Sequence, residues 1–212
     1  MERLAKKIAE SIGNSLGKSR EDVAVIAYGL IGILQFMAIF LLASVIGLVF
    51  SFWLEVAVVF LSVGFLRRLT GGAHSSGIYS CLVYSVFFVC TLAALARYGL
   101  STLPVTVNGI IAVCIFAFGY FMIARKAPVT PPNKPCRTEA KRKRLRKGAF
   151  TVLTIFLLLV AMSFVFKPWS ERLYSVGLAL LLSTLWQITM MTKAGHSFIS
   201  FFDGLFMTKK AK

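Results

Sequence analysis

Residues 23–50, VAVIAYGLIGILQFMAIFLLASVIGLVF, form an apolar run that contains no charged side chain. A helix needs about 20 apolar residues to cross the hydrocarbon of a bilayer, so this run is long enough to span it with some tilt. Ser19 and Asp22, just before the run, are typical of a helix N-terminus. The run therefore predicts a membrane-spanning helix rather than part of a water-soluble domain.

Five further apolar segments set the rest of the expected fold. They are residues 52–66, 78–96, 103–123, 149–166 and 173–191. None of them alternates with the period of two that is typical of barrel strands, and backbone groups in hydrocarbon must find hydrogen-bond partners within the protein. We therefore predict an all-α integral membrane protein with about six transmembrane helices.

The first 22 residues follow a different pattern. Apolar side chains recur every four residues among Arg and Lys, at Leu4, Ile8, Ile12 and Leu16. This spacing predicts a basic amphipathic helix that lies in the membrane interface. The segment lacks the apolar core and small-residue cleavage site of a signal peptide, so we expect it to remain on the mature protein.

Composition and charge exclude two classes of protein. Of the 212 residues 58% are hydrophobic, yet 24 Lys and Arg against 8 Asp and Glu give a net charge of +16. A soluble domain of this size has too little interior for so much apolar surface, and a nucleic-acid-binding protein carries its cations on a soluble body. We expect no nucleic acid partner.

The distribution of the cations predicts the orientation in the membrane. With six spans, the two termini and the loops on their side of the membrane hold 21 of the 24 Lys and Arg residues. The positive-inside rule then places both termini in the cytoplasm. We predict a single polytopic domain over 1–212: amphipathic helix 1–22, spans one to four in 23–124, basic cytoplasmic loop 125–148, spans five and six in 149–192, and cytoplasmic tail 193–212.

The segment with the densest chemical information is RRLTGGAHSSGIYSC, residues 67–81, on the cytoplasmic side between spans two and three. His74 supplies a base that titrates near neutral pH, and Cys81 lies where the positive end of a helix favours a thiolate. On one unbroken helix the two residues would lie about 10 Å apart along the axis, too far for a hydrogen bond. A catalytic pair therefore requires the 71–77 segment to fold back, with the next helix starting near Ser76 or Ile78.

These residues resemble those of the accessory gene regulator B (AgrB) family, membrane cysteine endopeptidases that process bacterial quorum-sensing propeptides. The resemblance rests on Arg67, the Gly71-Gly72-Ala73-His74 motif and Cys81 seven residues after the histidine. Residues 127–129 (Ala-Pro-Val) and 133–135 (Asn-Lys-Pro), ahead of the basic run, reinforce it.

The resemblance implies a multi-pass protein of the bacterial cell membrane whose active site faces the cytoplasm. It implies that His74 and Cys81 are the catalytic pair, supported by Arg67, Gly71 and Gly72, with no cofactor and no metal. The substrate would be an AgrD-like propeptide, whose acidic tail is cut off through an acyl thioester on Cys81 before the signal closes to a thiolactone or lactone. A homodimer and contacts with anionic lipid are further implications.

The basic loop offers a docking site for the acidic tail of such a substrate. Candidate substrate-binding residues are Lys134, Pro135, Lys141, Arg142, Lys143 and Arg144. The alternative interpretation is topological: the cations hold the loop in the cytoplasm and touch anionic lipid. Both interpretations can hold together.

The sequence leaves open the choice of base, the group that orients it, and the class of function. His196 is the rival base, and Asn133, Glu139 or Asp203 could orient His74. A different class of function also fits the helices and the charge: a non-catalytic membrane carrier or scaffold for an amphipathic peptide or lipid, in which His74 and Cys81 only pack.

Overall fold

The computed structural model describes residues 2–72, 77–129 and 138–207, and these contain helices and no strand. The chain divides into two units, residues 1–42 and 43–212, which are described separately. An all-helical protein with several apolar helices agrees with the sequence prediction.

The first unit holds α1 (Glu2–Ser15) and most of α2 (Arg20–Val49). The cap predicted at Ser19 is confirmed: its hydroxyl oxygen accepts a hydrogen bond from the backbone N–H of Asp22 at 3.2 Å. The buried residues of α1 are the small ones, Ala5, Ala9 and Gly13. Its larger apolar side chains Leu4 and Ile12 are exposed, so α1 has a solvent-accessible apolar face of the kind that an interfacial helix requires.

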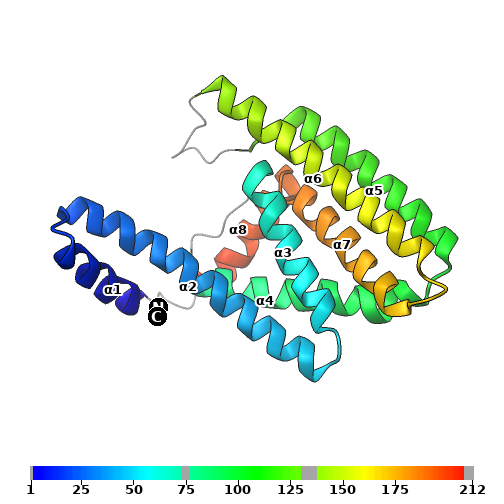
Figure 1. Ribbon diagram of the computed structural model, residues 1–212, viewed down its shortest axis with the longest axis horizontal. Coiled ribbons are helices and arrows are strands. Elements are labelled where there is room, and N and C mark those ends of the chain that lie inside the picture. Colours follow the sequence, from blue (N-terminus) through cyan, green and yellow to red (C-terminus); the bar gives the residue numbers. More distant parts are fainter. Residues whose placement is uncertain (1, 73–76, 130–137, 208–212) are drawn as a thin grey trace. The chain divides into compact units, whose positions relative to one another are not determined.

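The second unit is organised around α7 (Glu171–Thr189), whose residues 177–184 are all buried. The helices α3 (Trp53–Thr70), α5 (Val105–Lys126) and α6 (Glu139–Val165) pack against α7. Figure 1 shows α7 between α3 and α6. The helix α4 (Ile78–Ala94) packs on α3 and continues through a π-helical turn (Leu95–Gly99) and a 3-10 turn (Leu100–Thr102).

Hydrogen bonds between buried side chains join these helices. Ser62 on α3 donates to Ser183 on α7 at 2.6 Å. Asn108 on α5 donates through its amide to the Tyr174 hydroxyl of α7 at 2.8 Å. Buried polar groups cost free energy unless they are bonded, so these pairs fix which faces of the helices meet.

Glu55, in the first turn of α3, is fully buried. Its Oε1 atom lies 3.6 Å from Nε of Arg172 and accepts a hydrogen bond from the hydroxyl of Ser175, both at the start of α7. Arg97 of the π-helical turn donates to the same hydroxyl at 3.4 Å. A buried carboxylate thus ties α3, α7 and the π-helical turn together at one end of the unit.

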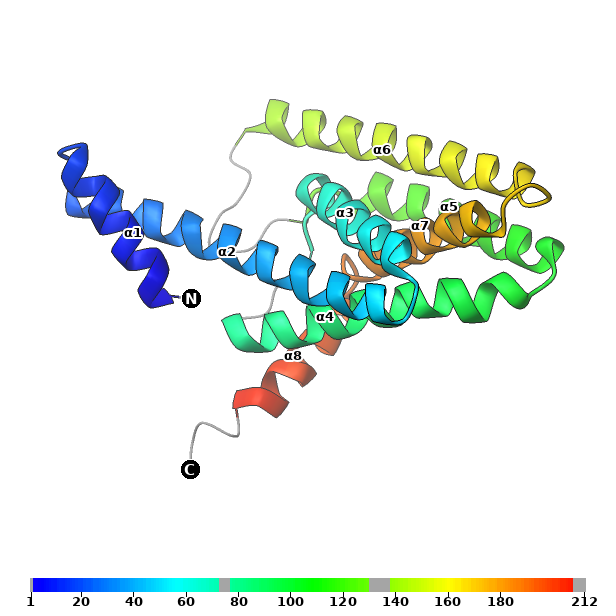
Figure 2. The same cartoon turned by 60° about the horizontal axis from the view of Figure 1, so that its bottom comes forward.

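At the opposite end of α7 the chain turns by 88° into α8 (Lys193–Met207). Figure 2 shows α8 leaving the end of α7 near α4. Stacked aromatic rings fix this corner: the ring centroid of Phe88 on α4 lies 4.4 Å from that of Trp186 and 5.3 Å from that of Phe198. The corner places α8 against the beginning of α4.

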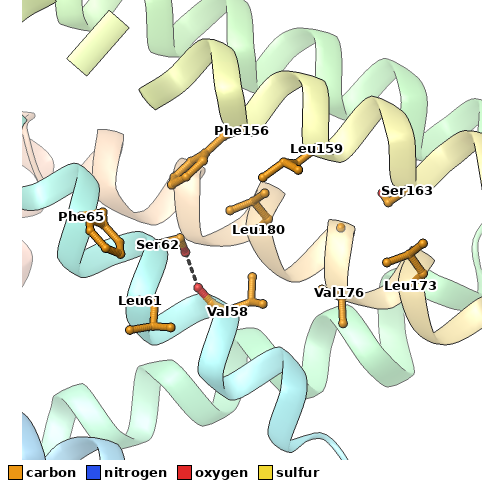
Figure 3. A pocket seen from close by; sticks show the side chains of 11 residues that line it. Val58, Leu61, Ser62, Phe65, Phe156, Leu159, Ser163, Leu173, Val176 and Leu180 are labelled. Atoms are coloured by element: carbon orange, nitrogen blue, oxygen red, sulfur yellow. Dashed lines mark hydrogen bonds between the residues drawn. The ribbon is translucent and has the colours of Figure 1, made fainter. Parts of the chain in front are cut away.

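An apolar cavity of about 280 Å³ lies between α3, α6 and α7 (Figure 3). Phe65, Phe156 and Leu180 are among its lining side chains, and the hydroxyl of Ser62 there donates to the carbonyl oxygen of Val58 on its own helix. Of the predicted site residues that the structure describes, none lines this cavity.

The number of helices that could span a membrane is lower than the predicted six. Four helices in the described part of the chain are long and apolar enough to cross a membrane alone: α2, residues 79–102, α5 and α6. The bent pair α7 and α8 would make a fifth. The helix α3 forms where a span was predicted, but its 18 residues include Glu55, Arg67 and Arg68.

Candidate active site

The helix α3 ends at Thr70, and two glycines follow it before the predicted site. Gly71 has φ +71° and Gly72 has φ +136°, conformations that residues with a Cβ rarely adopt. The Gly71 N–H donates to the carbonyl oxygen of Arg67 at 2.8 Å and closes the last helical turn. The sequence motif Gly-Gly is therefore required by the backbone at this point.

The chain that follows α5 lies alongside this turn. The Val129 N–H donates to the carbonyl oxygen of Thr70 at 2.8 Å, and Gly71 and Val129 form an isolated parallel bridge. A Cβ on Gly71 would overlap the Val129 carbonyl oxygen, so only glycine permits this approach. Val129 is the last described residue before the Pro-rich segment, which therefore begins beside the Gly-Gly turn.

Gln187, in the last turn of α7, holds the same turn from a third side. The Nε2 atom of its fully buried side chain donates to Thr70 Oγ1 at 2.9 Å and to the Gly71 carbonyl oxygen at 2.8 Å. A glutamine in an apolar helix signals a buried polar contact but does not reveal the partner.

Cys81 lies in the first turn of α4, as predicted. The helix begins at Ile78 after an N-cap glycine, Gly77, and the Cys81 N–H makes the first bond of the helix, to the Gly77 carbonyl oxygen at 2.9 Å. His74 precedes this start, so the expectation that the two residues do not share an unbroken helix is confirmed. His74 itself lies outside the described residues, and the distance between the two side chains stays a prediction.

The surroundings of Cys81 combine apolar packing with a few polar groups. Its half-buried side chain packs against the cluster of Tyr84, Met190 and Ile199, and its Sγ atom lies 3.9 Å from Ser85 Oγ. Tyr84 also interacts electrostatically with both Cys81 and Arg67.

The corner between α7 and α8 touches the chain on both sides of the segment that contains His74. Before that segment, the position of a Cβ on Gly72 lies 3.1 Å from the Met190 carbonyl oxygen. After it, the Met190 side chain packs in the cluster that contacts Cys81. The α7–α8 corner therefore contacts Gly72, before the 73–76 segment, and Cys81, in the first helical turn after it.

The three candidates for orienting the histidine fall in different places. Asp203 on α8 accepts a hydrogen bond from Ser80 Oγ at 3.3 Å, one residue before Cys81. Glu139 begins α6 and pairs with Lys143 at 3.4 Å on an exposed surface. Asn133 lies outside the described residues.

The rival base, His196, is on the exposed side of α8. Its Nδ1 atom lies 2.9 Å from the Thr192 carbonyl oxygen of its own helix. No hydrogen bond joins His196 to Cys81 among the interactions of the described residues. The His196 ring therefore contacts the backbone at the start of α8.

The basic run is helical rather than a loop, because α6 begins at Glu139 and contains residues 141–147. The candidate substrate-binding cations Lys141, Arg142, Lys143 and Arg144 are exposed. Arg146 instead donates to the Ala127 carbonyl oxygen at 3.0 Å, which ties the basic turns to the chain just before Val129. The candidates Lys134 and Pro135 lie outside the described residues.

Comparison with known proteins gives the family. The family model for accessory gene regulator B matches residues 5–191. The chain belongs to the AgrB family. An AgrB-like protein of Clostridium perfringens strain SM101 is 30% identical over 96% of both chains, and a second from strain 13 is 29% identical over the same share. An AgrB-like protein of Halalkalibacterium halodurans is 28% identical over 75% of this chain and 76% of its own. No solved structure matches this chain.

Membership in the family supports the expected role in peptide processing at a membrane. The AgrB family is involved in the peptide-processing step of accessory gene regulator quorum sensing, and this chain has the apolar helices of a membrane protein. The matched range includes Gly71, Cys81 and Gln187 and ends before Asp203. Asp203 is therefore near the site but outside the part of the chain that the family model matches.

Proposed function

We propose that the chain is a membrane cysteine endopeptidase that removes the C-terminal tail of an AgrD-like propeptide and closes the remaining signal into a ring. The observation that carries this proposal is the position of Cys81 in the first turn of α4, seven residues after His74, with the α7–α8 corner in contact with both Gly72 and Cys81. Family membership supports the same conclusion.

The chemistry follows from the residue types. The Cys81 thiolate attacks the carbonyl carbon at the junction of signal and tail, so a C–S bond forms and the C–N bond breaks. His74 accepts the thiol proton and passes it to the departing amine of the tail. An internal Cys or Ser of the peptide then attacks the acyl thioester, gives its proton to His74 and releases Cys81. The product is a thiolactone or a lactone.

The surroundings of Cys81 support this sequence of steps. Tyr84, Met190 and Ile199 shield one side of the thiol from water, which favours attack by the peptide's own nucleophile over hydrolysis. The N-cap of α4 is a glycine, which has no side chain to cap the helix, and N-terminal turns have backbone N–H groups available for a developing oxyanion. The positive charge of Arg67 acts on Tyr84, which packs against Cys81.

The basic turns of α6 fit the recruitment of the acidic tail. Four exposed cations, residues 141–144, follow the segment that starts beside Gly71. A negatively charged tail that binds these turns is thereby brought to the side of the unit where Cys81 lies, with its signal segment toward the thiol.

Co-expression with the propeptide tests the proposal. We expect Cys81→Ser and His74→Ala to abolish tail cleavage, because one removes the nucleophile and the other the base. Cys90→Ser is the matched control, since Cys90 is a second half-buried cysteine on α4. Full tail cleavage by Cys81→Ser would refute the assignment of Cys81 as the nucleophile. An equal loss of cleavage in Cys90→Ser would show that the effect is structural. The non-catalytic carrier predicts no effect from any of the three.

A further inference from the structure

We infer that Gln187 is a positioning residue, which acts on the reaction by holding the turn from which the segment with His74 departs. This inference rests on the proposed function, because Gln187 affects catalysis only if that segment takes part in the chemistry. The relevant contacts all lie within the unit of residues 43–212.

The Gln187 side chain donates its hydrogen bonds to a single turn, while its buried Oε1 atom has no hydrogen-bond partner among the described residues. A backbone carbonyl oxygen only accepts hydrogen bonds, so the Gln187 atom 2.8 Å from the Gly71 oxygen must be the amide nitrogen Nε2. The same nitrogen donates to Thr70 Oγ1, and that hydroxyl in turn donates to the Leu66 carbonyl oxygen at 2.9 Å. Both amide hydrogens are therefore donated to the last two residues before the segment 72–77, to Thr70 Oγ1 and to the Gly71 carbonyl oxygen.

Of the contacts that hold this turn, the bond from Gln187 is the one made to the carbonyl oxygen of Gly71 by another helix. Glycine has access to a wide range of backbone conformations, so Gly71 and Gly72 alone do not define where the chain goes next. The Val129 bridge fixes one side of Thr70 and Gly71, and Gln187 fixes the carbonyl of Gly71 on the other. His74 follows Gly71 by three residues in the sequence. A change in the orientation of the Gly71 carbonyl group therefore changes the direction in which the chain runs toward the histidine.

Packing alone is a weaker explanation of these contacts. A buried amide without partners costs more free energy than an apolar side chain of the same size, so a residue needed only for packing would be Leu or Met. The helices α3 and α7 already have another buried hydrogen bond, between Ser62 and Ser183 at 2.6 Å. That bond joins the same two helices without touching the Gly-Gly turn.

The Ser183 hydroxyl therefore supplies a matched control. We propose measuring tail cleavage by the purified full chain for Gln187→Met, which keeps the volume and removes the donor, and for Ser183→Ala, which removes a buried α3–α7 bond elsewhere. For Gln187→Met we expect kcat per folded protein to fall at least about 10-fold with KM within about twofold, because misplacement of a catalytic group by a fraction of an ångström has effects of this size. Ser183→Ala should leave both constants within about twofold.

Two further readouts separate a positioning role from a structural one. The rate of Cys81 alkylation at neutral pH needs no substrate, and it should fall in Gln187→Met toward the rate of His74→Ala. Thr70→Val removes one of the two acceptors of Gln187 and should lower kcat less than Gln187→Met; the double variant should be no worse than Gln187→Met alone, because the two residues act as a unit.

The outcomes distinguish this inference from the proposed function. If wild type cleaves and Cys81→Ser does not, the proposed function stands whatever Gln187→Met does. A Gln187→Met variant with wild-type kcat and alkylation rate, or a Ser183→Ala variant that loses as much, would overturn the role of Gln187 alone. Cleavage that persists in Cys81→Ser would overturn the proposed function itself.

Discussion

The side-chain amide of Gln187 donates a hydrogen bond to the Gly71 carbonyl oxygen at 2.8 Å, between residues that are 116 positions apart in the sequence. This bond joins the end of the central helix α7 to the turn that precedes His74. Together with the Val129 bridge and the contact of Gly72 with Met190, it brings three distant segments to one point. The chain therefore enters the His74 segment from a turn that is held on several sides.

Replacing Gly71 by Ala should disrupt the turn itself. The new Cβ would overlap the Val129 carbonyl oxygen and would sit at φ +71°, which costs about 1–2 kcal/mol for a residue other than glycine. We expect tail cleavage to fall at least about 10-fold in the co-expression assay. Gly29→Ala is the control, because Gly29 has open space around its Cβ position. Equal cleavage by the two variants would contradict the need for this turn.

Neutralising the basic turns of α6 should weaken substrate binding rather than chemistry. Changing Lys141, Arg142, Lys143 and Arg144 to Gln keeps a good helix former at each position and removes four positive charges. We expect KM for an acidic-tailed peptide to rise about 10-fold with little change in kcat. Wild-type KM should also rise with salt, and the variant's should rise less, because screening has fewer charges to act on.

A peptide with a neutral tail supplies the control for that experiment. Its KM should be nearly the same for wild type and variant, since the charge that the cations attract has been removed. If the variant impairs the acidic and the neutral peptide equally, the cations serve topology or lipid contact instead of the substrate.

Removing the buried carboxylate of Glu55 should lower stability. Glu55→Ala leaves Arg172 without its partner at 3.6 Å and removes the carboxylate that accepts from Ser175. We expect a loss of roughly 2–3 kcal/mol, below the 3–5 kcal/mol of a fully buried pair because the Arg172 side chain is 35% exposed. The thermal midpoint of the detergent-purified protein measures it. Glu171→Ala, which removes an exposed carboxylate in the same region, should change the midpoint little.

Activity per folded molecule should survive the Glu55 substitution. Fifteen residues of α3 separate Glu55 from Thr70, about 22 Å along the helix axis. An unchanged thermal midpoint would show that the contacts of Glu55 with Arg172 and Ser175 do not stabilise the fold. A variant that is folded but inactive would show that Glu55 has a role in activity.

Selective thiol chemistry should mark Cys81. We expect iodoacetamide to modify Cys81 near neutral pH at least about 10-fold faster than Cys90 or Cys114, because the proposed mechanism makes His74 the base that activates this thiol. His74→Ala should remove most of the difference. Slow labelling of all three cysteines at one rate would instead favour a non-catalytic carrier.

The local features of this fold were predictable because they depend on neighbours in the sequence. The apolar runs indicated the helices, Ser19 and Asp22 indicated the start of α2, and the glycines before Ile78 indicated the start of α4; all are confirmed. The position of Cys81 in a first helical turn follows from the same local signals.

The long-range contacts were not predictable from one sequence. Nothing local indicates that Gln187 bonds to Gly71, that Val129 pairs beside it, or that Asp203 lies next to Ser80, because each contact depends on how whole helices pack. The basic segment 139–147 was expected as a loop on account of its charge, but it is the exposed beginning of α6, since Lys and Arg are also good helix formers.

The acyl-enzyme on Cys81 tests the central claim most directly. A propeptide whose internal Cys or Ser is replaced by Ala lacks the nucleophile that closes the ring, so the intermediate should accumulate on the wild-type protein. Mass spectrometry of the intact chain and its fragments should then show the signal segment attached to Cys81 through a bond that hydroxylamine cleaves, and His74→Ala should show none. Release of the tail without any adduct on Cys81, and undiminished release by Cys81→Ser, would contradict a catalytic role for this cysteine.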